Sequence, residues 1–184
     1  MTALRVMPSF TLGSRRSMRL VERNLYVYKH GWMILLSGFF EPLFYLLGIG
    51  FGLGALIGTI PGPGGQEISY QLFVAPALLA SAAMNGAINE STFNFFFKLN
   101  YNKTFTAILS TPLAPGDIAL GELAWALIRG GLYAVGFMGV MVLLGLFISP
   151  WVILAVPAAL LVGFTFGAVG MAATSSCLFR LSFQ

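Results

Sequence analysis

Long apolar stretches, separated by short polar ones, make up most of this chain. A transmembrane helix needs roughly 20 consecutive apolar residues, and several stretches reach that length. The pattern predicts four spans, at about residues 31–57, 69–89, 118–148 and 151–174. We therefore expect an all-α, polytopic helix bundle in which residues 31–184 form one transmembrane domain.

The chain before the first span has a different pattern. Residues 1–13 show no periodicity and are expected to be disordered. Over residues 14–32, apolar side chains recur at steps of three and four, with charged side chains between them. The apolar stripe consists of Met18, Val21, Leu25, Tyr28 and Trp32. This spacing predicts an amphipathic helix that lies at the membrane interface, in contact with lipid.

Basic residues are distributed unevenly along the chain. Six of the ten Lys and Arg residues precede residue 31, whereas the loop predicted at 58–68 has none. Apart from Arg129, which lies inside a span, all of them fall on one side of the predicted membrane. The positive-inside rule then makes both termini cytoplasmic in a multi-pass membrane protein. A basic run that leads directly into a span argues against nucleic acid as a partner.

The composition excludes several classes of protein. The 184 residues are 58% hydrophobic and 9% charged, with a mean hydropathy of +0.86, whereas a soluble domain has about 25% charged residues. There is no Gly-Lys pair for a phosphate-binding loop, and His30 and Cys177 are the only residues of their types. We therefore expect no ATP site, no catalytic site, no metal site and no cofactor on this chain.

Charged and amide residues inside the predicted spans are candidates for function. Glu41 and Arg129 lie at similar depths of the first and third spans, and Glu122 shares a helix face with Arg129. Asn85 and Asn89 lie on one side of the second span. A charge in hydrocarbon is costly unless it is paired or hydrated. Two interpretations stay open: an interhelical Glu41–Arg129 pair with polar contacts between helices, or the polar lining of a substrate path or gate.

A ladder of small residues follows Glu41 in the first span. Gly50, Gly54 and Gly58 are spaced by four residues. Small residues at this spacing allow helix backbones to approach closely in lipid. They predict helix packing, either within the chain or across a dimer.

Residues 91–117 are more polar and are expected to be a cytoplasmic segment between the second and third spans. Residues 102–110 can form a short helix, which Thr111 and Pro112 would end. Asp117 is the expected N-cap of the third span. A short helix at a fixed position suits either the grip of a soluble partner or an ordinary structured loop.

With these segments in place, the chain resembles the permease subunit of type-2 ABC exporters, in the branch of the nodulation-factor (lipo-oligosaccharide) and daunorubicin exporters. The likeness covers residues 15–184 and rests on the order and spacing of several short stretches. These stretches are residues 39–43 (FFEPL), 70–89, 111–113, 116–123 and 170–174 (GMAAT).

The resemblance implies a partner and a mechanism. Such permeases lie in a bacterial-type inner membrane and form dimers that carry two cytoplasmic ATPase subunits, and ATP with magnesium binds those subunits. The segment between the second and third helices would be the coupling helix that contacts the ATPase. The residues that would carry this contact are Tyr101, Thr104, Phe105, Ile108, Leu109 and Leu113. The permease is then a transport subunit and not an enzyme, with a drug or a lipid-linked saccharide as substrate.

One departure from the family accompanies this resemblance. Family members have six helices, so the chain that ends at Gln184 is expected to be a fragment or a natural truncation. The alternatives to an exporter are a membrane scaffold or assembly subunit without transport, and an ion-driven carrier in which Glu41 titrates during turnover.

Overall fold

A computed structural model describes residues 15–62, 65–146 and 150–181 of the chain. The expectation of disorder for residues 1–13 concerns residues outside these ranges. The first half of the fold contains α1 (Arg15–His30), α2 (Trp32–Tyr45), η1 (Leu46–Leu53), α3 (Gly54–Ile57), β1 (Thr59–Pro61) and β2 (Glu67–Ser69). The second half contains α4 (Tyr70–Asn89), η2 (Glu90–Asn94), η3 (Phe97–Tyr101), α5 (Thr104–Leu109), α6 (Pro115–Leu143), η4 (Pro150–Leu154) and α7 (Ala155–Leu181).

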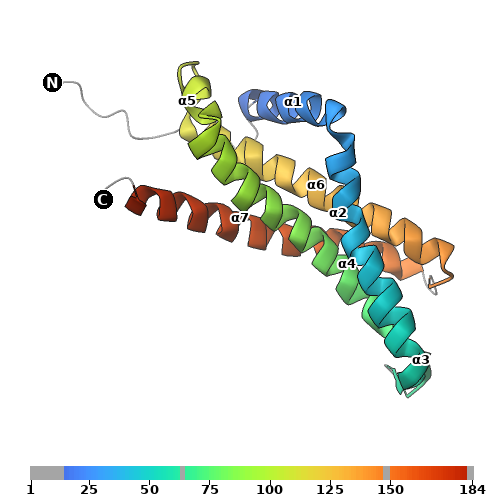
Figure 1. Cartoon of the computed structure of the whole chain (residues 1–184). Coiled ribbons are helices and arrows are strands. Elements are labelled where there is room, and N and C mark those ends of the chain that lie inside the picture. The colour runs from blue at the N-terminus through green and yellow to red at the C-terminus, as the bar shows by residue number, and fades with distance from the viewer. Residues whose placement is uncertain (1–14, 63–64, 147–149, 182–184) are drawn as a thin grey trace.

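The predicted fold class is confirmed. Apart from one short hairpin, the described chain is helical, and it contains four helices that are long and apolar enough to cross a membrane. These helices cover Phe40–Ile57, Tyr70–Tyr101, Pro115–Leu143 and Val152–Cys177. Figure 1 shows α1 and α5 at one end of the molecule and α3 at the opposite end.

Helix α1 runs across the bundle, and the chain turns at Gly31 into α2 (Figure 1). From Trp32 the helix is continuous through η1 and α3, where it ends at Gly58. Gly58 has a φ of 73°, a conformation that costs glycine little. The expected loop after it contains a hairpin, in which β1 pairs antiparallel with β2. Strands of three residues are too short to give a pattern in the sequence.

The two faces of α1 have different neighbours. Met18 and Leu25 of the predicted apolar stripe are exposed, as they would be in contact with lipid. The opposite face contacts α6: Leu20 is buried, and a Cβ added to Gly121 would lie 2.8 Å from it. Asn24 of α1 is also buried. The amphipathic helix is therefore a packed element of the bundle, and its lipid-facing role stays a prediction.

The second span is longer than its predicted end at residue 89. Helical backbone continues from α4 through η2 and η3 to Tyr101, with wider π-type turns in η2 and η3. At 1.5 Å per residue these 32 residues extend over roughly 48 Å, compared with about 30 Å for the hydrocarbon core of a bilayer. The helix is therefore longer than the hydrocarbon is thick, and only α5 and a short linker lie between it and α6.

The N-terminus of α6 corrects one prediction. Asp117 is not the N-cap but the third residue of the helix, because Pro115 occupies the first position. The Asp117 carboxylate accepts a hydrogen bond from the Ala114 backbone N–H, at 3.1 Å. Proline suits a first helical position because its missing N–H has no partner there.

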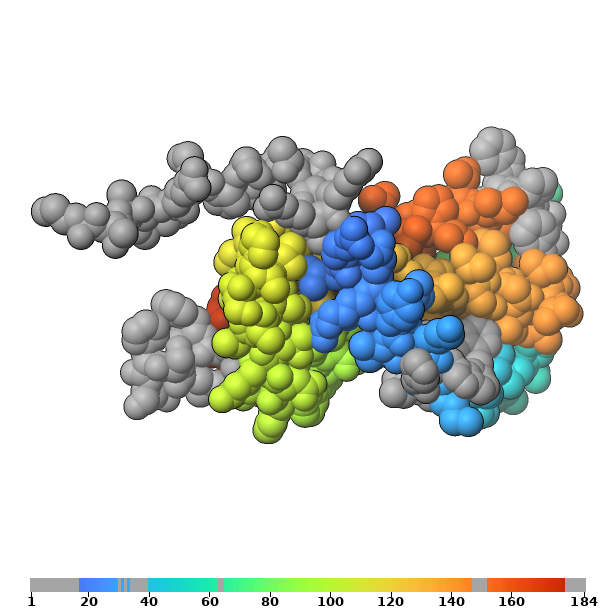
Figure 2. All heavy atoms as spheres, turned by 90° about the horizontal axis from the view of Figure 1, so that it is seen from above, coloured from blue at the N-terminus to red at the C-terminus, as the bar shows by residue number. Residues whose placement is uncertain are grey.

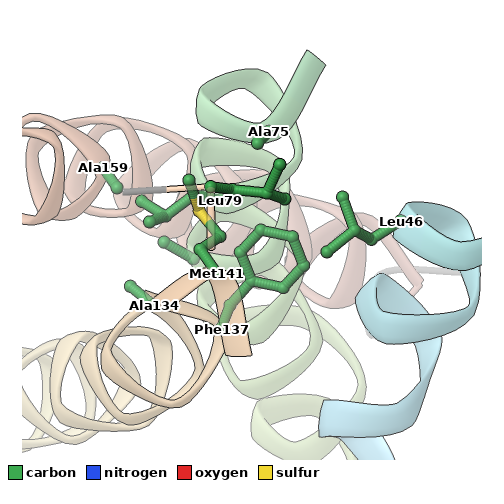
Figure 3. Close-up of a cluster of buried hydrophobic side chains, with 9 residues drawn as sticks. Leu46, Ala75, Leu79, Ala134, Phe137, Met141 and Ala159 are labelled. Atoms are coloured by element: carbon green, nitrogen blue, oxygen red, sulfur yellow. The ribbon is translucent and has the colours of Figure 1, made fainter. Parts of the chain in front are cut away.

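Helix α4 crosses α6 and α7 and packs against both, and α6 and α7 also contact each other (Figure 1). In one core cluster the Phe137 ring of α6 lies among side chains from η1, α4 and α7 (Figure 3). Small residues bring these helices together. A Cβ on Gly130 of α6 would lie 2.7 Å from the backbone oxygen of Ala83, and Gly163 of α7 approaches the same oxygen.

The predicted glycine ladder has three different environments. A Cβ on Gly54 would lie 3.2 Å from the Gln71 side chain of α4, so this glycine lies at a helix–helix contact. Gly50 is buried against Leu46 of its own helix, and Gly58 ends the helix. Their role in a dimer stays a prediction.

Candidate functional site

Four charged side chains meet where α1 crosses the bundle. Glu90, Glu122 and Arg129 are buried, and Lys98 is mostly buried. The Arg129 guanidinium lies 2.5 Å from Glu90, and the Lys98 ammonium lies 3.0 Å from Glu90 and 2.5 Å from Glu122. Two carboxylates and two cations cancel, so the network is neutral when all four groups are charged. Neutrality and dense hydrogen bonding are what make buried charges tolerable.

Glu90 is the centre of this network. One carboxylate oxygen accepts a hydrogen bond from Lys98. The other accepts from Arg129, from the Asn94 amide at 2.7 Å and from the Tyr28 hydroxyl at 3.1 Å. The spacing of four residues between Glu90, Asn94 and Lys98 places all three on one side of the helical rod.

Helix α1 contributes two polar side chains to the network. The Asn24 amide donates to Glu122 at 3.2 Å. The Tyr28 hydroxyl donates to Glu90 and accepts from Asn94 and Arg129, which uses its one hydrogen and both lone pairs. Burial raises the pKa of the Tyr28 phenol, and the negative charge of Glu90 raises it further. Tyr28 therefore stays protonated at neutral pH and keeps its donor.

Aromatic rings enclose the cation of the network. The Arg129 guanidinium carbon lies 5.5 Å from the ring centroid of Tyr28 and 5.7 Å from that of Tyr133. Its Nε donates to the Tyr133 hydroxyl at 3.1 Å. The Tyr28 ring in turn lies 5.2 Å from the ring of Trp125. These contacts hold the guanidinium in one orientation, because cation–π and hydrogen-bond geometry both restrict it.

A polar cavity of about 320 Å³ adjoins the network. Arg129 and Tyr133 form part of its inner wall, and Glu41, Asn85 and Asn89 line it from α2 and α4. The structure thus gathers most of the residues predicted as a lining. It does not pair Glu41 with Arg129: the ion pair of Arg129 is with Glu90 of η2. Glu122 belongs to the network and is not among the residues that line the cavity.

The residues predicted to contact a partner lie on both sides of α5. Phe105 is 3% exposed, with its ring centroid 5.1 Å from that of Phe95, and Ile108 packs on the same cluster. Tyr101 and Leu109 are exposed. Thr104 and Leu113, the remaining two, are half-buried. The inward residues fix α5 to the end of the second span, and the outward ones form a surface.

Comparison with known proteins agrees with the likeness noted in the sequence. Nodulation protein J of Rhizobium leguminosarum bv. trifolii is 35% identical over 166 residues, which are 89% of this chain and 61% of that protein. The protein of the same name from Rhizobium meliloti is 35% identical over 77% of this chain and 52% of its own length. The chain is similar to nodulation protein J. These relatives carry the name of the nodulation branch to which the resemblance pointed.

The chain spans about three fifths or less of the length of the nodulation J proteins it matches. The similarity covers most of this chain, which includes the helices that form the network and the cavity. No family model matches the chain, and no solved structure matches it significantly.

Sequence reasoning missed the centre of the network. Glu90 lies just after the predicted end of the second span, Lys98 lies in the segment predicted to be cytoplasmic, and Tyr28 was placed only on the apolar stripe of the first helix. The repeated spacing of four in Glu90, Asn94 and Lys98 was the available signal for a continued helix. Among the described residues, no group of three or more His, Cys, Asp or Glu side chains is arranged to hold a metal ion.

Proposed function

We propose that this chain is the membrane-spanning permease of an ATP-driven exporter of the type-2 ABC class, with ATP hydrolysis by a separate cytoplasmic subunit. The observation that carries the proposal is the similarity to nodulation protein J over 89% of the chain. The four helices able to cross a membrane and the amphipathic α1 support it. The substrate is then a lipophilic or lipid-linked molecule such as a drug or a lipo-oligosaccharide.

The distribution of charge supports a cytoplasmic location for the end of the molecule that carries α1 and α5. Lys29, Lys98 and Lys103 lie in or beside these elements, which share one end of the bundle (Figure 1). The opposite end, with α3 and the hairpin, has no Lys or Arg among its described residues. By the positive-inside rule both termini are then cytoplasmic.

The exposed surface of α5 is the proposed docking site for the ATPase. Leu109 is 47% exposed and Tyr101 is 68% exposed, and both lie at the end of the molecule where the ATPase would bind. Figure 2 shows this segment as a protruding ridge beside α1. Phe105 holds the ridge in place from within, so its contribution to docking is indirect. A second copy of the permease and a second ATPase would complete the exporter.

Co-purification tests this proposal with three matched variants. The native gene product is tagged and isolated in detergent together with an ATPase encoded beside it. Leu109→Asp changes the exposed ridge, Phe105→Asp changes its internal support, and Gln66→Asp places the same charge on the exposed hairpin at the opposite end. We expect the wild type and Gln66→Asp to retain the ATPase and Leu109→Asp to lose it while remaining folded. Phe105→Asp should lose both the ATPase and thermal stability.

Two outcomes would replace the proposal. If no ATPase binds any form, the chain is a scaffold or assembly subunit without an ATP-driven partner. If transport in vesicles persists without ATP, collapses with the proton gradient and requires Glu41, the chain is part of an ion-driven carrier.

A further inference from the structure

Lys98 joins parts of the molecule that are far apart in the sequence. It lies in η3, close to the end of the helical rod Tyr70–Tyr101, and α5 begins soon afterwards at Thr104. Its ammonium contacts Glu90 of the same rod and Glu122 of α6. We infer that Lys98 is a positioning residue that couples the position of α5 to that of α1, and that it acts through these two carboxylates. This coupling goes beyond the proposed function and does not depend on an ATPase.

The two carboxylates that Lys98 contacts are the same two that bind the polar side chains of α1. Glu122 accepts a hydrogen bond from the Asn24 amide at 3.2 Å, and Glu90 accepts one from the Tyr28 hydroxyl at 3.1 Å. One ammonium therefore lies at the junction of both polar attachments of α1. A displacement of Lys98 changes the charge balance at each of these carboxylates.

Burial makes this junction respond as a unit. Glu122 is 2% exposed, and among the described residues its other hydrogen-bond partner is the Asn24 amide. If Lys98 moved away alone, Glu122 would remain a buried carboxylate with one neutral partner, which is costly. We therefore expect the end of the rod to carry Glu122 and the attached α1 with it.

The rod has a backbone in which such a movement can arise. Glu90 lies in η2 and Lys98 lies in η3, and both segments have π-type turns. Such turns are uncommon and are often found at functional sites. A π turn contains more residues than an α turn, so a return of either segment to α-helical turns would rotate Lys98 about the rod relative to Glu90.

A second route between α5 and α1 is apolar. Leu20 of α1 and Phe105 of α5 belong to one buried cluster. A test must therefore distinguish the charged route through Lys98 from this apolar route. A double-mutant cycle does so, because two changes on the same route have effects that do not add.

Lys103, the residue before α5, offers a way to displace α5. Its φ is 46°, which proline cannot adopt because its ring holds φ near about −65°. Lys103→Pro therefore changes the angle between the rod and α5. Glycine adopts the observed φ without strain, so Lys103→Gly is the matched control. The Lys103 side chain is exposed, and neither change removes a buried contact.

The second change of the cycle removes the junction. Lys98→Met combined with Glu122→Gln keeps the network neutral, because Glu90 and Arg129 remain as a pair. Lys98→Arg retains the positive charge and is the conservative control. Each background is combined with Lys103→Pro or Lys103→Gly and reconstituted in nanodiscs. Hydrogen–deuterium exchange of the α1 backbone amides, followed by mass spectrometry, reports how firmly α1 is held.

We expect Lys103→Pro to exchange the α1 amides about fivefold faster or more than Lys103→Gly does, both in the wild-type network and with Lys98→Arg. In the Lys98→Met/Glu122→Gln background the ratio should fall below about twofold. Equal ratios in the two backgrounds would overturn the inference and assign the coupling to the apolar cluster. A ratio close to one in the wild-type network would overturn it as well.

A further variant keeps the test decisive if Lys98→Met/Glu122→Gln does not fold. Asn24→Leu with Tyr28→Phe interrupts the same route at its α1 end and leaves all four charges in place. This variant should lower the ratio in the same way, and an unchanged ratio would count against Lys98. Because no step uses an ATPase, co-purification can fail while this coupling is observed, and the reverse result is equally distinguishable.

Discussion

Replacing Glu90 by glutamine is the sharpest test of the buried network. The two side chains have nearly the same shape, so the change removes charge without creating a cavity. Each oxygen of Glu90 faces a cation: one accepts from Lys98 and the other accepts from Arg129. Whichever way the new amide is turned, its NH₂ group must point at a positively charged donor. Glu90→Gln therefore loses two charge-assisted hydrogen bonds and introduces a donor–donor contact.

The magnitude follows from burial and from the partners that remain. Removing one member of a buried ion pair costs about 3–5 kcal/mol, because the other charge is left uncompensated. Here Lys98 keeps its contact with Glu122 at 2.5 Å, and Arg129 borders a polar cavity that water can enter. Both features reduce the penalty. We expect Glu90→Gln to lower the free energy of unfolding by about 2–4 kcal/mol.

Unfolding in mixed micelles with increasing dodecyl sulfate, followed by far-ultraviolet circular dichroism, measures this change. The matched control is Glu22→Gln, because Glu22 forms an exposed pair with Arg19 at 3.4 Å. Exposed pairs contribute about 0–1 kcal/mol, so the control should unfold close to the wild type. The reasoning is refuted if Glu90→Gln destabilises the protein no more than Glu22→Gln does.

Two further predictions concern close packing and the Tyr28 phenol. Gly130→Ala should lower the free energy of unfolding by about 1–3 kcal/mol, because the new Cβ would lie 2.7 Å from the Ala83 backbone oxygen. Gly48 has open space around it, so Gly48→Ala should be neutral or slightly stabilising in the same unfolding assay. Folding raises the pKa of the Tyr28 phenol, so the protonated phenol stabilises the folded protein. This stabilisation is complete below the ordinary tyrosine pKa of about 10 and is lost only as the pH rises through the raised pKa. Up to about pH 10.5, the change in ultraviolet absorbance from ionised tyrosine should therefore be the same in the wild type and in Tyr28→Phe. A larger change in the wild type would contradict the burial argument.

The sequence predicted the parts of the fold that depend on long apolar runs. Four apolar segments and an amphipathic first helix follow from hydrophobicity and period alone, and the structure contains α1 and four helices that are long and apolar enough to cross a membrane. The predicted second span ends at Asn89, because the residues that follow it are polar. Those residues continue the helix since Glu90 and Lys98 are neutralised by partners that lie far away in the chain. Hydropathy counts each charge singly and cannot include this compensation.

The candidate site could be predicted only in part for the same reason. Arg129 was recognised as a buried charge that needs a partner, and Glu41 was a reasonable choice because it lies at a similar depth. The choice between Glu41 and Glu90 depends on how the second helix is rotated and how far it extends, and both depend on contacts between helices such as that of Gly130 with Ala83. Small residues line these contacts in α7 as well: Ala155, Ala159, Gly163 and Gly167 repeat at a spacing of four, and Gly163 and Gly167 lie against Ala83 and Ala87 of α4, a signal in the sequence that was overlooked.

The network also explains how an amphipathic helix becomes a fixed part of the bundle. A lone surface helix of 16 residues gains little stability by itself, so α1 needs contacts with the rest of the protein. It is attached by Asn24 to Glu122 and by Tyr28 to Glu90, and Lys98 links those two carboxylates. Lys98 lies close to the end of the helical rod that leads into α5. We therefore expect a displacement of that end to alter the hydrogen bonds that hold both α1 side chains.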